Sequence, residues 1–412
     1  MTTPNQLRQD WSKGIDNQSD HRRLAVGAQV AGQQQAGTVR DLVNLDPQID
    51  GTLKGRAGFE QVLGCTDARA IMALGDEILV ADGASLVCWN TLTASSRVLG
   101  EIDAAGSVTG AVFNDELFIS AGTRCLRYDG QTLRQWGVPP VQRQPEPTLV
   151  PGGLAAGTYQ IAATFSNAQG EEGATTLPLL ITLDREQGLT FNLPTPPVGG
   201  RCNLYVSAVN GATLYLQAQG AGSVLVSRLD DSGVQLGTER LGEPLPGALV
   251  VAHNAVLLMA VANVLWFTLP LRPHLRDAAR GFLAYPAPID FVLPTPGGVY
   301  VGSDKTYFVT ALETGNVEQR EVLPYGGTAG VQLPDSRVAW MSQYGQVVGT
   351  PDGQVTLLSG QRFAPQLAAT GAAGLIERHG NPMIVSTLRG PARENPLAAS
   401  DYYEAEIIRH DT

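Results

Sequence analysis

Short apolar segments alternate with polar turns along most of the chain, and one pattern of them recurs. Each unit has an apolar strand, a turn with Gly, Asp or Asn, a second apolar strand ending in a small residue, and a third strand. Six copies are found, at 68–90, 108–130, 247–268, 289–311, 336–359 and, more weakly, 371–388 followed by 402–409. Helical periodicity is almost absent, and only 273–281 predicts a short helical turn.

Self-similarity at roughly 40 residues, with three or four short strands per unit, is typical of β-propeller blades. The first turns of the copies align at Gly75-Asp76, Asn114-Asp115, His253-Asn254, Pro296-Gly297-Gly298, Gln343-Tyr344-Gly345 and His379-Gly380-Asn381. The pattern therefore predicts an all-β fold based on a six-bladed β-propeller. The segment 38–63 holds one or two strands, and we predict that 38–46 pairs with the last blade and closes the ring.

The repeat is interrupted between its second and third copies. A Pro-rich linker at 140–153 leads into alternating strands, with Asn210-Gly211 as a hairpin turn. This pattern predicts a small β-sandwich inserted into the propeller. The expected organisation is an N-terminal arm at 1–23, the closing strand and first two blades at 24–139, the sandwich at 140–244, and four blades at 245–412.

The N-terminal arm has no periodicity but carries apolar groups that are unfavourable in water. Trp11 and Ile15 suggest docking on a neighbouring subunit, with the large ring of Trp11 as the anchor. The arm contains four basic residues and three aspartates, a net charge of +1 in a chain of net charge −11. The predicted partner-binding residues are Trp11, Ile15, Arg22 and Arg23, with an acidic subunit or DNA as the partner; the alternative is a solvated arm.

Composition restricts the class of protein further. Charged residues make up 16% and hydrophobic residues 43%, with 47 Gly and 26 Pro spread along the chain, as expected for many strands joined by tight turns. The acidic balance disfavours a nucleic-acid groove. We expect no secretory signal and no membrane span. The four cysteines, Cys65, Cys88, Cys125 and Cys202, lack CxxC spacing and are predicted to be small buried residues in a reducing cytosol.

No pattern predicts an active site. The five histidines lack metal-ligand spacing, and the acidic turns do not match a calcium loop. Asp230 and Asp231 are adjacent, so on a strand they would point to opposite faces. The sialidase Asp-box is absent, and the Gly-rich segment 327–332 lacks the Lys-Ser/Thr of a phosphate-binding loop. We therefore predict a protein that is not an enzyme and holds no cofactor or metal.

The order of several segments resembles β-propeller tail proteins of tailed bacteriophages. Residues 14–17 and 39–62 are similar to the opening of those chains, and further matches follow at 265–275, 289–309 and 338–358. Residues 153–173 and 203–216 resemble the fibronectin-III-type sandwiches common in phage virion proteins. The resemblance implies a virion structural protein near the tail, similar to nozzle or hub proteins, although this chain is much shorter than the nozzle proteins.

We therefore expect a non-enzymatic component of a phage tail nozzle, hub or baseplate, made in the host cytoplasm. Its expected partners are other tail proteins and further copies of itself, in a homo-oligomer or ring that the genome passes without specific binding. The alternative is a host-surface propeller that binds or cleaves carbohydrate. Of five tryptophans, three lie in strand-like segments and are predicted to be core rather than sugar platforms. A cellular scaffold propeller fits the same physics and is disfavoured only by the resemblance.

Overall fold

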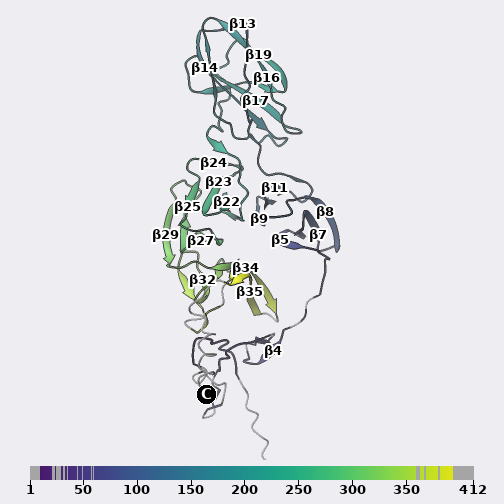
Figure 1. Ribbon diagram of the computed structural model, residues 1–412, viewed down its shortest axis with the longest axis vertical. Coiled ribbons are helices and arrows are strands. Elements are labelled where there is room, and N and C mark those ends of the chain that lie inside the picture. The colour runs from purple at the N-terminus through teal and green to yellow at the C-terminus, as the bar shows by residue number, and fades with distance from the viewer. Residues whose placement is uncertain are drawn as a thin grey trace, which may run out of the picture. The chain divides into compact units, whose positions relative to one another are not determined.

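The computed structural model describes residues 10–392 except 21–23, 25–28, 31–32, 35, 44, 49, 57, 59, 359–361, 366–367 and 379–380. Strands joined by turns make up this part of the chain, with no helix among the described residues, so the all-β prediction is confirmed (Figure 1). Two compact units are present. One holds residues up to Gly64, Asp290–Thr310 and those from Glu318 onward, and the other holds Cys65–Ile289 and Ala311–Val317.

The unit that begins at Cys65 contains three antiparallel meanders. The first is β5 (Ala68–Leu74), β6 (Glu77–Asp82), β7 (Ser85–Asn90) and β8 (Ser95–Glu101). The second is β9 (Val108–Phe113), β10 (Glu116–Ala121), β11 (Arg124–Tyr128) and β12 (Leu133–Gln135). The third is β21 (Leu249–His253), β22 (Val256–Val261), β23 (Val264–Leu269) and β25 (Phe282–Ala284), with β24 (Arg272–Asp277) beside β23 and β20 (Leu241–Gly242) beside β24. The first strands are neighbours, β5 with β9 and β9 with β21.

The other unit repeats this arrangement. Its meanders are β26 (Phe291–Thr295), β27 (Gly298–Gly302), β28 (Thr306–Thr310) and β29 (Glu318–Leu323), then β30 (Thr328–Gln332), β31 (Val338–Ser342), β32 (Gly345–Gly349) and β33 (Val355–Leu357). A hairpin of β34 (Ala368–Arg378) and β35 (Asn381–Ala392) follows, and β30 lies between β26 and β34. Two small hairpins precede them in sequence, β1 (Gln29–Val30) with β2 (Gln33–Gln34) and β3 (Leu45–Pro47) with β4 (Leu53–Gly55).

Four-stranded meanders whose first strands are neighbours are the structural unit of a β-propeller. Their cores lie between successive meanders rather than within one. Phe118, Leu257 and Met259 share a cluster between the second and third, and Phe291, Tyr300 and Trp340 share one between the fourth and fifth. The turns explain why the repeat is visible in the sequence. Asn114 and Asp115 both have positive φ, as a two-residue hairpin turn requires.

Three details of the prediction are wrong. Residues 272–277 form strand β24, and only a single turn follows, where the Asp277 carbonyl accepts from Gly281 N. The predicted fifth copy, 336–359, begins at the second strand of its meander, because 328–332 is the first strand. The expected closing strand is not formed among the described residues, where β3 pairs with β4 and Val39 bridges Ile15. The segment 402–409 lies outside the described residues.

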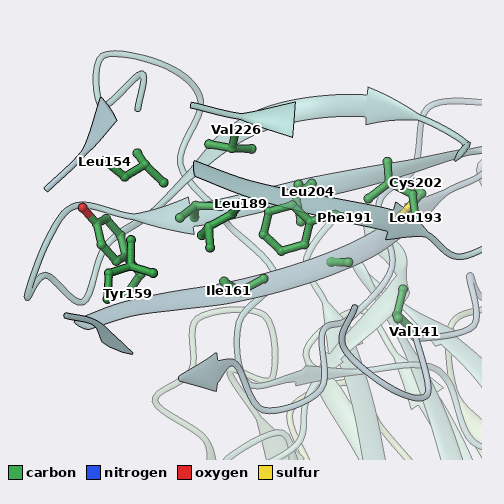
Figure 2. Close-up of a cluster of buried hydrophobic side chains, with 13 residues drawn as sticks. Val141, Leu154, Tyr159, Ile161, Leu189, Phe191, Leu193, Cys202, Leu204 and Val226 are labelled. Carbon is green, nitrogen blue, oxygen red and sulfur yellow. The ribbon is translucent and has the colours of Figure 1, made fainter. Parts of the chain in front are cut away.

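The interruption of the repeat is a two-sheet sandwich. One sheet has β13 (Thr148–Leu154), β16 (Gln187–Leu193) and β19 (Gly222–Val226) in that order. The other has β15 (Leu179–Leu183), β14 (Gly157–Ser166), β17 (Arg201–Ser207) and β18 (Leu214–Gly220). Figure 2 shows the apolar side chains between the sheets, among them Ile161, Phe191 and Leu204, which are fully buried.

The two ends of the sandwich segment lie side by side. A Cβ atom on Gly137 would be 2.8 Å from Cδ of Pro244. The residues at which the chain enters and leaves the sandwich are therefore adjacent in space. The Cys125 thiol also lies 3.9 Å from the Pro244 carbonyl. The chain therefore leaves and rejoins the meanders at one point, which is the geometry of an inserted domain.

Candidate functional site

The described part of the predicted arm folds onto its own chain. Trp11 N donates to the Gly51 carbonyl at 2.7 Å, and Ile15 forms a parallel bridge with Val39. Asn17 makes the strongest attachment: its Nδ2 donates to Ala364 O at 2.8 Å, and its Oδ1 accepts from Ala364 N at 3.0 Å. One amide side chain thus fastens the arm to a segment that follows 347 residues later.

The predicted partner-binding residues are placed only in part. Trp11 and Ile15 are half-buried against their own chain, which satisfies some of the apolar surface that the sequence suggested for a neighbour. Arg22 and Arg23 lie outside the described residues. A groove of about 440 Å³ borders the arm, lined on one side by Lys13 and Ile15 and on the other by Leu358 and Arg362. The structure brings Trp11 and Ile15 into one folded segment and leaves the arginines unassigned.

A group of buried and half-buried charges joins the sandwich to the second and third meanders. Arg127 of β11 donates to Glu171 through both terminal nitrogens, at 2.9 Å each, and its side chain is 4% exposed. Its Nε lies 3.5 Å from Oε2 of Glu116, which also pairs with Arg134. His274 of β24 completes the group, with Nδ1 3.6 Å from Oε1 of Glu171. We call Glu116, Arg127, Arg134, Glu171 and His274 the junction cluster.

The electrostatics of the junction cluster follow from its burial and pairing. Burial alone would raise the pKa of Glu171, but the hydrogen bonds from Arg127 and Asn167 outweigh it and hold the pKa below its usual value. Burial lowers the pKa of His274, an effect that the carboxylate of Glu171 opposes and Arg127 reinforces. Glu171 is therefore an anion bound by a buried guanidinium, a bidentate pair with fixed geometry.

Tryptophans support the same junction by packing. Trp136 is fully buried just before the sandwich, and its Nε1 donates to Pro273 O at 2.7 Å. Its ring meets Phe118 edge-on, with centroids 5.2 Å apart. Trp266 is covered by the Arg276 guanidinium, 4.3 Å from the ring centroid, whose Nε donates to Glu243 O. Side chains from before, within and after the insertion therefore fix one junction.

A second groove lies between the fourth and fifth meanders. It measures about 580 Å³ and is lined by Phe308 and Arg320 on one side and by Pro351 and Asp352 on the other. The Arg320 guanidinium sits 5.3 Å from the Phe308 ring centroid and donates to Asp352 O. Phe308 is only 3% exposed, so the groove offers no aromatic ring for a sugar to stack on.

The reactive side chains have structural surroundings. Cys88, Cys125 and Cys202 are buried, as predicted, and Cys65 is half-buried. Burial raises the pKa of Cys125 to about 12, which opposes thiolate formation. Glu172 accepts from Asn203 Nδ2 at 3.0 Å and from Tyr205 OH at 2.7 Å inside the sandwich. The described residues contain no group of three metal-ligating side chains, and none belongs to a helix able to span a membrane.

Sequence reasoning missed the junction cluster. Arg127 and Glu171 are separated by 44 residues, and the sequence showed only an arginine on a strand and a glutamate in a turn. The sequence pattern predicts a short helical turn at His274, where the structure has β24. A charged residue in the third strand of the second copy, where other copies carry apolar residues, was the one available signal.

Comparisons with known proteins identify no relative by sequence. No protein family matches the chain, and no curated protein resembles it. Solved structures give low similarity. AztD of Citrobacter koseri has 10% identity over 86% of this chain and 95% of that one, at a TM-score of 0.32. The WD40 β-propeller domain of Doa1 has 8% identity over 78% and 93%, at 0.26. BBS1N, solved with ARL6DN, has 11% identity over 81% and 96%, at 0.31. TM-scores this low establish no shared function and no blade number.

Proposed function

We propose that this chain is a non-enzymatic structural component of a bacteriophage tail, present in several copies and in contact with other virion proteins. The junction cluster is the observation that carries the proposal. A bidentate buried ion pair and a buried tryptophan fix the sandwich to the meanders at one point. A rigid frame that displays an added domain suits a building block whose function is contact and shape.

The blade pattern, the net charge and the cysteines support this proposal. The proposed frame has six blades, in two groups of three, with an insert of fibronectin-III type. The acidic charge of −11 disfavours retention of DNA, which suits a conduit through which a genome slides. Three of the four cysteines are buried as free thiols, in keeping with synthesis in the host cytoplasm. Within the tail we propose a place in the nozzle, the hub or the baseplate, and electron microscopy of labelled virions would distinguish the three.

The test is location in the particle. Virions of a phage that encodes this chain would be purified, quantified by mass spectrometry and labelled with antibody-gold against the chain for electron microscopy. We expect several copies per particle and label at the tail. A chain absent from washed virions, or labelled on the head, contradicts the proposal.

Deletion of residues 1–20 tests the role of the arm, but it also removes Asn17, which holds Ala364 of the same chain. Trp11→Ala is the sharper variant, because it removes the predicted anchor and keeps Asn17. We expect reduced incorporation for Trp11→Ala. Normal incorporation of a folded Trp11→Ala protein would show that Trp11 is not the anchor of the assembly contact.

The rival function is binding or cleavage of host carbohydrate. The groove at Arg320 and Asp352 gives it a location, since it combines a guanidinium with carboxyl and backbone groups. Trp136 and Trp340 are fully buried, so neither can serve as a sugar platform. Binding to immobilised host polysaccharide that Arg320→Ala abolishes would favour this rival.

A further inference from the structure

The sandwich leaves one edge strand with free backbone groups and no protection. β15 pairs only with β14 and ends the four-stranded sheet. Leu180 on this strand is 65% exposed and Leu177 just before it is 88% exposed. No charged residue occurs from 173 to 183, a segment described throughout. A bare apolar edge of this kind is a template for another strand.

Several other edge strands in the described part of the chain carry features that discourage pairing. β13 carries Pro151 and a bulge, and β18 is covered where Leu216 N donates to Val234 O. β19 has no such feature: it is uncharged, and its Leu225 is 57% exposed. Outer strands of the meanders carry charge, such as Arg97 on β8 and Arg320 on β29. β15 and β19 are therefore the uncharged edges of the sandwich, and the exposed Leu177 and Leu180 make β15 the more apolar of the two.

We propose that β15 pairs antiparallel with β15 of a second copy of this chain, about a two-fold axis at Ile181. This deepens the proposed assembly in several copies by naming the contact surface and the partner. An antiparallel pair related by a two-fold axis keeps the faces of both strands aligned, so residues opposite each other must have the same parity. Centring on Ile181 places Leu180 opposite the partner's Thr182 and Leu179 opposite the partner's Leu183.

The sequence around Ile181 suits this register. Leu180 and Thr182 are both exposed, whereas Leu179 and Leu183 face the core side, so each face meets its own kind. Pro178 limits the pairing to the five residues of β15. Beyond it, Asp184 would lie opposite Pro178 and Arg185 opposite Leu177, so no like charges meet. The result is a continuous sheet through two sandwiches, with self-complementary contacts.

The first test is the oligomeric state of the full chain over a concentration series, measured by light scattering after gel filtration. Leu180→Lys adds a charge to the proposed contact and should raise the dimer dissociation constant at least about tenfold. The matched control is Val98→Lys on β8, which is 67% exposed on an edge strand that already carries Arg97. Val98→Lys should leave the dimer unchanged.

Cross-linking tests the register independently. The double variant Leu180→Cys with Thr182→Cys should form an intermolecular disulfide, because the two positions are opposite across the axis. Leu177→Cys is the control: it is more exposed, but its two copies would lie eight positions apart along the strands, roughly 27 Å. Random collision would favour the control.

Three results would overturn the proposal: a chain that stays monomeric at every concentration, a dimer unaffected by Leu180→Lys, or cross-linking through Leu177→Cys as efficient as through the 180/182 pair. The second result would leave assembly in several copies intact and move its contact elsewhere. Failure of the tail assignment would instead appear as absence from virions, whatever the oligomeric state.

Discussion

The sandwich and the meanders achieve stability in different ways. The sandwich encloses its own core between two sheets, with Ile161, Phe191 and Leu204 fully buried. A single meander does not enclose a core of its own, because its large side chains pack against the next meander. Trp340, for example, packs against Phe291 and Tyr300. One region is therefore a self-contained domain, and the other is stable only as a series of neighbours.

The contact between these two regions adds a group of buried and half-buried charges to its apolar packing. Glu171 belongs to the sandwich, Arg127 to the second meander and His274 to β24, which pairs with β23 of the third meander. Apolar packing would hold such domains together with less directional preference. A bidentate pair fixes orientation as well as contact, which is what a display frame needs.

The largest effect should come from breaking a shared core. Trp340→Ala removes a fully buried ring and should cost about 4 kcal/mol, destabilising both meanders that it joins. Phe191→Ala should cost a similar amount, but only in the sandwich. Hydrogen exchange on both variants checks this: protection should fall across the fourth and fifth meanders in the first, and within 148–226 in the second. Equal loss everywhere would contradict separate cores.

A smaller effect is expected from Glu171→Gln. The amide keeps the size of the side chain but leaves the guanidinium of Arg127 without its bidentate carboxylate, so we expect a loss of about 3 kcal/mol at the junction. Glu186→Gln, on an exposed turn of the same sandwich, is the control and should be neutral. Chemical denaturation measures both, and a neutral Glu171→Gln would show that the cluster does not hold the junction.

The junction cluster also predicts a dependence of stability on pH. The folded pKa of His274 lies below its ordinary value of 6.5, so stability is full above that value and decreases as the pH falls toward the folded pKa. Glu171 has a lowered pKa too, so its contribution is lost below about 4.5. Between pH 7 and 5 the free energy of unfolding should fall, and His274→Gln should flatten the slope. Buried His253 acts with the same sign and should account for what remains. If the slope is unchanged in His274→Gln, His274 is not the source of the pH dependence.

The smallest effect concerns the arm. Asn17→Ala removes two hydrogen bonds to Ala364 and should destabilise that attachment by about 1 kcal/mol. Limited proteolysis should then cleave the arm faster, while the thermal midpoint of the whole chain changes little. Lys13→Ala, an exposed change in the same arm, should leave the cleavage rate as it is.

Local pattern explains which parts of this structure could be predicted. Asn114 and Asp115 form a turn whose residues specify a hairpin, so the second copy was visible in sequence. The first strand of the fifth meander, 328–332, was missed because it contains Gly330 and small residues, whose close approach to Leu293 suits an inner strand but carries no apolar signal. The junction cluster depends on contacts between distant segments, and its one signal in the sequence is Arg127, a charged residue where the other copies carry apolar residues.

The sandwich should be a self-contained insert in a frame that folds without it. Gly137 and Pro244 already touch, so a chain lacking 138–243 can be closed by one peptide bond or a short glycine link. Differential scanning calorimetry of this deletion variant is the direct measurement. We predict a soluble protein with one cooperative transition, at a somewhat lower midpoint because Glu171, the partner of Arg127, is removed. An aggregated product, or a scan with no transition, would contradict the account.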